Sequence, residues 1–482
     1  MSVNQSTEYS SLSEEPPEQE NQLISFQEFE ISGSTPLREI VSEIRGDNSK
    51  SPSNTHFESR VSEIITKVKN EGDAALLELS ARYDGASFST AKSLFVPKDE
   101  FDIASESLSK QQKEALRSAH AQIRWLAKSQ MRKRYRKCTY RTPLGFTVEE
   151  SFAPLKRIGG YVPGGLASYP STVLMICAPA REAGVSDIVL ATPPNSSGKV
   201  APALLYAASL CGVSEVIKLG GAQAIASLAY GSESIQKVEL IAGPGNQYVT
   251  EAKRQVSASG AVLIDALAGP TELLILADRR ARPDLVSEDL ISQAEHGNKT
   301  LIGVVSDSAE FLSRVRDATY EAVSIKRERY EHIRQSCLFS VKARSLDEAV
   351  EFAQSFAPEH LELHASNASS FERKLTSAGL ILSGEYVPCS ATDYIVGTDH
   401  ILPTGGSASR SSGLSVETFL RRVTVVRSSS ASLRRALKPL AELAKLEGLP
   451  NHAAAANTRF RRIVEGPRRR KGKQSRQKSK GR

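Results

Sequence analysis

This 482-residue sequence lacks long apolar runs and paired cysteines. No stretch approaches the roughly 18 uninterrupted apolar residues that a helix needs to cross a bilayer, so we expect a protein that does not span a membrane. The five cysteines are odd in number, widely spaced and without a CxxC pair. We therefore expect reduced thiols, a cytoplasmic location, no disulfide and no cysteine-rich zinc site.

The short motifs that most often identify an enzyme are also absent. The sequence contains no GxGxxG, GxxxxGKS/T, HExxH or GxSxG, so nothing points directly to a standard dinucleotide fold, a P-loop, a zinc protease or a serine hydrolase. Residues 1–37 hold seven Glu and no Lys or Arg. This composition fits neither a secretory signal nor an organelle transit peptide.

Positive charge is concentrated at one end of the chain. The net charge is +7, but residues 466–482 carry nine Lys and Arg and no acid, so the rest of the chain is nearly neutral. We expect disordered tails, acidic at 1–35 and basic at 466–482. The basic tail has no aromatic residue, which argues against specific nucleic-acid readout. A polyanion-binding protein with an inert body remains an alternative from another functional class.

The body of the chain follows an α/β pattern. Helical spacing in 36–160 predicts a helical region that contributes to the first α/β domain. From there, short apolar strands alternate with helices of about 10–14 residues, which is typical of βαβ units with a parallel sheet covered on both faces. We expect two α/β domains at 161–270 and 271–414, and a C-terminal helical segment at 415–465.

Three glycine-rich turns follow predicted strands of the first α/β domain. Each opens toward a helix and carries an amide or phenol side chain, namely Tyr161, Gln223 and Asn246. Such turns let a ligand reach backbone N–H groups at a helix N-terminus. A nucleotide-like ligand is one interpretation, and ordinary tight turns are the other.

Histidines gather beside oxygen-bearing side chains in the second half of the chain. Gln293 and His296 lie three residues apart, on one face of a predicted helix, and Asp393 and His400 share a polar loop. His452 follows a Gly-Leu-Pro break. Neutral imidazole with hard oxygen ligands fits zinc, although spacing this long is weak evidence alone.

The adjacent pair Glu359-His360 suggests proton chemistry. A histidine near neutrality can take a proton from an alcohol, while a neighbouring carboxylate activates water. An ordinary helix-end pair is the alternative.

Eight segments, in this order, resemble the histidinol dehydrogenase family: GGYVPGG, GGAQAIASLA, GPGNQYVTEAKRQV, DALAGPTELLILAD, SQAEHG, FAPEHLEL, DYIVGTDHILPT and EGLPNH. The likeness extends over about residues 36–465 and excludes both tails. It implies an NAD-dependent enzyme of histidine biosynthesis that oxidises L-histidinol to L-histidine in two hydride transfers, through a bound histidinal. It also implies two incomplete Rossmann-like domains that bind NAD without the usual fingerprint. A homodimer is implied as well, in which the C-terminal segment completes the partner's active site.

The resemblance assigns roles to individual residues. One zinc ion per subunit would be held by Gln293, His296, Asp393 and His452. Catalysis would use His360 as the base for the alcohol and Glu359 to activate water. The NAD-contacting positions would be Tyr161, Gln223 and Asn246. Substrate would contact Thr271, Gln293, His296, His360, Asp393, His400, Glu447 and His452.

Three residues depart from the family's usual pattern. Thr271 stands where the family usually has Ser, which tightens the pocket by a methyl group. Thr392 and Asp399 replace the Gly and Asn of the usual GDY and TNH, and we expect the Asp399 carboxylate to raise the pKa of His400. These changes leave open a paralogous zinc- and NAD-dependent dehydrogenase that acts on another small polar alcohol.

Overall fold

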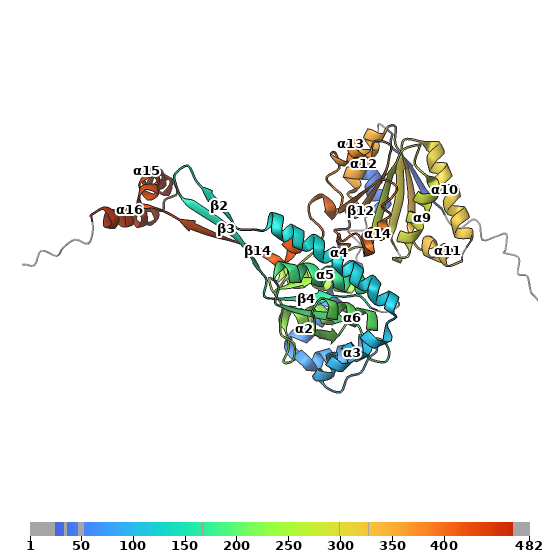
Figure 1. Ribbon diagram of the computed structural model, residues 1–482, viewed down its shortest axis with the longest axis horizontal. Helices are drawn as coiled ribbons and strands as arrows, with labels where there is room; N and C mark the ends of the chain where they lie inside the picture. The colour runs from blue at the N-terminus through green and yellow to red at the C-terminus, as the bar shows by residue number, and fades with distance from the viewer. Residues whose placement is uncertain are drawn as a thin grey trace, which may run out of the picture. The chain divides into compact units, whose positions relative to one another are not determined.

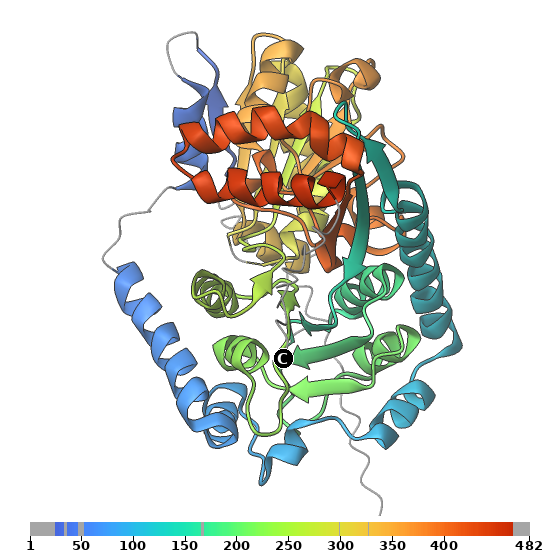
Figure 2. The same cartoon turned by 90° about the vertical axis from the view of Figure 1, so that its left-hand side faces the viewer.

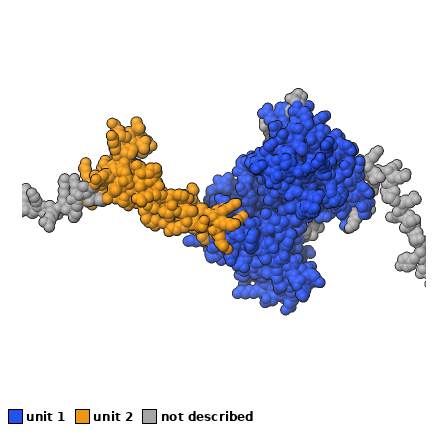
Figure 3. All heavy atoms as spheres, turned by 45° about the horizontal axis from the view of Figure 1, so that its top comes forward, with its two compact units in different colours: residues 1–129, 155–419 blue, residues 130–154, 420–482 orange. Residues whose placement is uncertain are grey.

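A computed structural model describes residues 25–32, 36–46, 53–164, 168–297, 299–325 and 327–465. Most of the predicted acidic tail and all of the predicted basic tail lie outside these ranges. The chain forms two compact units, Met1–Ser129 with Leu155–Phe419, and Gln130–Pro154 with Leu420–Arg482 (Figure 3).

The first unit contains a five-stranded parallel sheet in the order β6-β5-β4-β7-β8. Figure 1 labels its strand β4. Its strands are β4 (Arg157–Tyr161), β5 (Asp187–Thr192), β6 (Glu215–Lys218), β7 (Leu240–Ala242) and β8 (Leu263–Ile264). The connecting helices are α5 (Pro170–Ala183), α6 (Pro202–Leu210), α7 (Gly221–Tyr230) and α8 (Gln247–Ala258). All five residues of β4 are buried, as expected when helices cover both faces of a parallel sheet.

N-terminal helices complete this first sheet layer. Helix α2 (Ser53–Leu79) packs against α7 and α8, and α3 (Lys98–Ser107) packs against α6. The apolar face of α2 enters the same core as Val189, Ile217 and Ile241 of the sheet. The following helix, α4, spans Lys110–Arg134.

A second parallel sheet in the same unit has six strands in the order β1-β11-β10-β9-β12-β13. They are β1 (Gln27–Glu30), β9 (Glu272–Ala277), β10 (Leu301–Ser306), β11 (Cys337–Lys342), β12 (His360–His364) and β13 (Leu380–Ser383). The helices are α1 (Leu37–Arg45), α9 (Pro283–Ala294), α10 (Ala309–Ser324), α11 (Arg327–Arg334), α12 (Leu346–Phe356), α13 (Ala368–Glu372) and α14 (Cys389–Tyr394). Two parallel α/β layers therefore confirm the predicted fold class.

Alternation along β9 explains how the helices divide between the two faces of this sheet. Leu274 and Leu276 share a core with α1 and α12, whereas Leu273 and Ile275 share a core with α9 and α10. Successive side chains of a strand point to opposite faces. A continuously apolar strand such as β9 thus has a helix layer on each side.

Strand β1 differs from the expectation of disorder at 1–35. It extends the sheet in parallel along β11, and its flanking residues Phe26 and Ile31 are buried. The apolar contacts of these two side chains offset the cost of ordering an otherwise acidic segment.

The second unit also departs from the purely helical expectation. It holds a three-stranded antiparallel sheet, with β2 (Cys138–Arg141), β3 (Thr147–Pro154) and β14 (Leu420–Arg427) in the order β14-β3-β2. The β-branched residues Val423, Thr424, Val425 and Val426 favour an extended strand. Helices α15 (Ser430–Leu446) and α16 (Pro450–Glu465) follow and lie side by side (Figure 2).

Among the described residues, no helix combines the length and the apolar character that crossing a membrane requires.

Candidate active site

Glu359 and His360 lie where α12 has ended and β12 begins. Ala357 takes a left-handed conformation, with φ of 49°, and closes the helix. The Glu359 carboxylate Oε2 then accepts a hydrogen bond of 3.0 Å from the backbone N–H of Glu272, at the start of β9. The neighbouring strand therefore fixes the direction of the Glu359 side chain.

The His360 ring is buried, and neither of its nitrogens has a hydrogen-bond partner. Its Nδ1 lies 3.9 Å from Oε2 of Glu359, and its Nε2 lies 4.0 Å from Oδ1 of Asp393. Buried polar atoms without partners are rare in folded proteins. The free ring nitrogens therefore indicate a group that meets a ligand.

Burial shifts the proton affinities of both side chains. It lowers the pKa of His360 to about 3, and the charges of His400 and His296 act in the same direction. Burial raises the pKa of Glu359 well above its ordinary value. The imidazole is thus neutral near pH 7, the form that can accept a proton.

Oxygen and sulfur atoms from two helices surround His360. Gln293, on the last turn of α9, donates from Nε2 to Oδ2 of Asp393 over 3.4 Å, while its own Oε1 is buried without a partner. Cys389, one helical turn before Asp393 on α14, brings its Sγ within 4.8 Å of ligand atoms of His360 and Asp393. These groups form a buried set that can hold a metal ion.

His296 and His400 border this set. His296 is exposed just beyond α9, and its charge affects the pKa of Asp393. The His400 ring contacts the Asp393 carbonyl oxygen through Nδ1 at 3.1 Å and the Thr172 hydroxyl through Nε2 at 3.2 Å. Because Thr172 belongs to α5, His400 links the two sheet layers. Thr271 immediately precedes β9, and its carbonyl accepts from Leu301 N–H at 2.9 Å.

The expectation that Asp399 raises the pKa of His400 is wrong. Burial lowers the pKa of His400 to about 4, and Asp399 is not among the groups that shift it. The Asp399 carboxylate is itself buried, with Oδ1 accepting from Ile401 N–H at 2.9 Å and Oδ2 without a partner. Burial raises the pKa of Asp399 well above its ordinary value.

The three glycine-rich turns meet at the carboxyl ends of the strands in the first sheet. The Tyr161 hydroxyl accepts from Gly221 N–H at 3.2 Å. At Gly243, φ is +119° and an added Cβ would lie 2.1 Å from the Tyr161 carbonyl oxygen. The Asn246 side chain caps α8 by accepting from Tyr248 and Val249. This convergence is where open parallel sheets bind ligands.

Asp84 is a polar residue of these turns that the sequence analysis missed. Its Oδ2 accepts from Gly220 N–H and from Gln223 Nε2, each at 3.2 Å. Burial raises its pKa. It stands after α2, more than a hundred residues before its partners, so no local spacing signals the contact.

Arg45 and Glu272 support the catalytic end of the second sheet, and the sequence analysis missed them too. They form an ion pair in which the Glu272 side chain is 2% exposed. Arg45 Nη2 also donates to the Phe356 carbonyl at 2.8 Å, and Glu272 Oε1 accepts from Gly405 N–H at 3.0 Å. The same Glu272 donates its backbone N–H to Glu359.

Asp289, Glu362 and His364 form a second buried cluster of side chains that could bind a metal ion. Asp289 of α9 faces Glu362 and His364 of β12, and their ligand atoms lie within 4.8 Å of one another. Glu362 Oε1 accepts the N–H of Cys389 at 3.0 Å, which fixes the start of α14. Burial and the Glu362 charge raise the pKa of Asp289 to about 7.

Glu447 and His452 lie in the second unit. Glu447 is the C-terminal cap of α15, and His452 is in the first turn of α16. Both are exposed. All contacts of the site given above come from the first unit.

Known proteins resemble this chain over most of its length. A family model described as Histidinol dehydrogenase matches residues 47–460. The histidinol dehydrogenase of Xanthomonas euvesicatoria pv. vesicatoria (strain 85-10) is 40% identical over 408 residues, covering 84% of this chain and 93% of that protein. The histidinol dehydrogenase of Synechococcus sp. (strain ATCC 27144 / PCC 6301 / SAUG 1402/1) is 39% identical over 412 residues, covering 84% and 92%.

A solved structure agrees in fold. The crystal structure of histidinol dehydrogenase from Elizabethkingia anophelis matches with a TM-score of 0.79 and 31% sequence identity, covering 93% of this chain and 97% of that chain.

Proposed function

The chain belongs to the histidinol dehydrogenase family, and we propose that it oxidises L-histidinol to L-histidine in two NAD-dependent steps through an aldehyde that stays bound. The observation that carries this proposal is the buried Glu359-His360 pair beside Gln293 and Asp393, with free ring nitrogens on His360. A different small polar alcohol is not favoured, because family and relatives agree over most of the chain.

The donor set fits a zinc ion. Gln293 Oε1 is buried without a partner, and Asp393 and His296 add a carboxylate and an imidazole, all ligand types that zinc accepts. We propose Gln293, His296 and Asp393 as ligands, with His452 supplied by a second copy of the chain in a homodimer. Zinc bound there would act as a Lewis acid that orients the substrate's amine and imidazole.

The protein's own groups move the protons. His360, neutral and buried, accepts the proton of the substrate hydroxyl in the first oxidation. Glu359 accepts a proton from the water that hydrates the aldehyde. Bound NAD would supply the hydride acceptor for each oxidation. Enclosure of the aldehyde by buried side chains limits its escape into water.

Cofactor and substrate are assigned to the two sides of the site. Tyr161, Gln223 and Asn246 are proposed to contact NAD, which their position at the carboxyl ends of the first sheet supports. Thr271, His400 and Glu447 are proposed to contact substrate. The His400–Thr172 hydrogen bond supports a site between the two sheet layers.

Separate assays of the two oxidations test the division of labour. His360→Asn should reduce the rate from histidinol by about 10²–10⁴-fold, the usual contribution of a general base. Glu359→Gln should slow histidinal oxidation by a similar factor and affect the first step much less. His56→Asn, an exposed histidine of α2, is the matched control and should leave both rates unchanged. Equal loss of both steps in Glu359→Gln would refute the separate roles.

A further inference from the structure

A buried ion pair contacts the GPGN turn (residues 243–246), which connects β7 to α8. Lys253 belongs to α8, and Asp265 directly follows β8. Their side chains are only 2% and 3% exposed. Burial of two charges can cost more than their attraction supplies, so a buried ion pair is weak evidence of stabilisation. What distinguishes this pair is the set of contacts that it makes with the turn.

Both charged groups bind the backbone of a single buried residue, Gly243. Lys253 Nζ donates to the Gly243 carbonyl oxygen at 2.9 Å, and Gly243 N–H donates to Asp265 Oδ2 at 2.7 Å. Asp265 is itself held to the sheet, because its own N–H donates to the Ile241 carbonyl at 3.2 Å. Buried backbone groups need hydrogen-bond partners. At Gly243, where β7 has ended, the two side chains supply them.

The backbone at Gly243 has a conformation that favours glycine, with φ of +119°. The turn passes so close to β4 that an added Cβ would lie 2.1 Å from the Tyr161 carbonyl oxygen. Three residues later, the exposed Asn246 caps α8, and it is a proposed NAD contact. The ion pair thus fixes the buried end of the turn, and Asn246 lies at its exposed end.

Helix α8 also holds the segment that follows Asp265. Thr250, three residues before Lys253, donates from Oγ1 to the Ala268 carbonyl at 2.8 Å. Residues three apart lie on the same face of a helix. This face of α8 therefore joins the GPGN turn to the connection between β8 and β9, which carries Thr271, a proposed substrate contact.

We propose that Lys253 and Asp265 are positioning residues for NAD, which hold the GPGN turn in the conformation that receives the cofactor. The inference rests on the proposed function, because it takes NAD to bind at this end of the first sheet. An apolar pair could fill the same space, but it could neither donate to the Gly243 carbonyl nor accept from the Gly243 N–H. Since both side chains are buried, they act through the turn rather than by touching NAD.

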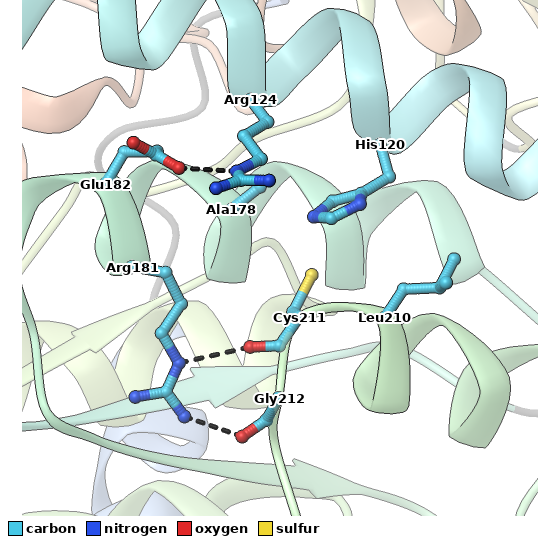
Figure 4. A pocket seen from close by; sticks show the side chains of 8 residues that line it. All are labelled: His120, Arg124, Ala178, Arg181, Glu182, Leu210, Cys211 and Gly212. Atoms are coloured by element: carbon cyan, nitrogen blue, oxygen red, sulfur yellow. Dashed lines mark hydrogen bonds and ion pairs between the residues drawn. The ribbon is translucent and has the colours of Figure 1, made fainter.

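A similar contact at the opposite end of the same sheet provides a matched control. Arg181, in the last turn of α5, donates from Nε to the Cys211 carbonyl at 3.1 Å and from Nη2 to the Gly212 carbonyl at 2.8 Å (Figure 4). These carbonyls belong to the connection that leads into β6, at the amino ends of the strands, whereas open parallel sheets bind ligands at the carboxyl ends. Arg181→Met should therefore lower stability without changing the affinity for NADH.

The test compares wild type, Lys253→Met, Asp265→Asn and the double variant as purified full-length protein supplied with Zn²⁺. Fluorescence titration measures the Kd for NADH, and urea titration measures stability. Lys253→Met removes the donor to the Gly243 carbonyl, so Kd should rise at least about tenfold, the usual value of a hydrogen bond to a charged group. Asp265→Asn keeps an acceptor for Gly243 N–H.

The double variant separates positioning from stabilisation. It should regain much of the urea midpoint lost in Lys253→Met, because no buried charge remains. Its Kd for NADH should stay raised, because the Gly243 carbonyl still lacks a donor. If Lys253→Met does not fold, comparison of the double variant with Asp265→Asn isolates the same donor.

Recovery of NADH affinity together with stability in the double variant would reduce the pair to a structural role and overturn the proposal. An unchanged Kd in both variants that lack Lys253 would do the same. A wild type that binds no NADH would contradict the cofactor site and this inference together. If NADH binding follows the expected pattern but the wild type does not oxidise histidinol, the positioning role stands and only the proposed function fails.

Discussion

Replacement of Arg45 by Met tests whether the first helix secures the catalytic end of the second sheet. Arg45 ends α1 and pairs with Glu272, whose side chain is 2% exposed. It also lies over the Phe356 ring, with its guanidinium carbon 4.4 Å from the ring centroid. Met keeps much of this apolar contact, so Arg45→Met mainly removes the positive charge beside a buried carboxylate.

Removing one partner of a buried ion pair leaves the other uncompensated, which costs about 3–5 kcal/mol. Arg45→Met should therefore lower the unfolding free energy by about that amount, seen as a lower urea midpoint by circular dichroism. Glu272→Gln keeps an acceptor for Gly405 N–H, and the double variant should recover at least about 2 kcal/mol of the loss because no buried charge remains.

The pH dependence of the stability loss in Arg45→Met gives a second test. Burial already raises the pKa of Glu272, against the effect of Arg45, and loss of Arg45 should raise it further. A carboxyl group with a raised folded-state pKa stabilises least at high pH. The Arg45→Met deficit should thus be larger at pH 8 than at pH 5. A deficit below about 0.5 kcal/mol, or a double variant no better than the single one, would refute the reasoning.

Substitutions at three further positions probe the site. Asp399→Asn removes a buried carboxylate whose Oδ2 has no partner, and it should raise the unfolding free energy by about 1–3 kcal/mol at pH 8. Because the pKa of Asp399 is raised in the folded protein, this gain in stability should shrink as the pH falls. Urea titrations at several pH values measure it. Gly243→Ala would place a Cβ 2.1 Å from the Tyr161 carbonyl oxygen, so the turn must move, and KM for NAD should rise at least about tenfold, or ~1.4 kcal/mol. Asn246→Ala removes the cap of α8 and should cost about 1 kcal/mol of stability, whereas Asn246→Asp keeps the cap. If Asn246 contacts NAD, steady-state kinetics should show a raised KM for NAD in both variants. An unchanged KM for NAD in Asn246→Asp would limit the role of the residue to capping.

The parallel sheets could be predicted because their strands carry a local signal. The run ELLILA of β9 is buried at every position, and it reads directly as a strand covered on both faces. Glu359, His360, Gln293 and Asp393 could be selected from the resemblance, and the structure brings them together. Their roles as ligand, base and cofactor contacts stay predictions.

Other features had no local signal. The Arg45–Glu272 pair joins residues 227 positions apart, and Asp84 contacts Gly220 across 136 positions, so neither follows from periodicity. Cys389 did have a local signal, because it precedes Asp393 by one helical turn. The antiparallel strands β2, β3 and β14 lie next to long helices in sequence, whose 3–4 spacing dominated the pattern there. The acidic composition around β1 outweighed the signal of Phe26 and Ile31, the two buried apolar residues that flank the strand.

The central claim is a four-electron oxidation that depends on a metal ion, and the ratio of NADH formed to L-histidinol consumed tests it most directly. The measurement uses purified protein supplied with Zn²⁺, beside a sample treated with a chelator and one in which Zn²⁺ is then restored. We expect about two NADH per histidinol, since each oxidation passes one hydride to NAD, with activity lost on chelation and recovered with zinc. One NADH per histidinol with free histidinal as product, or an unchanged rate after complete metal removal, would contradict the account.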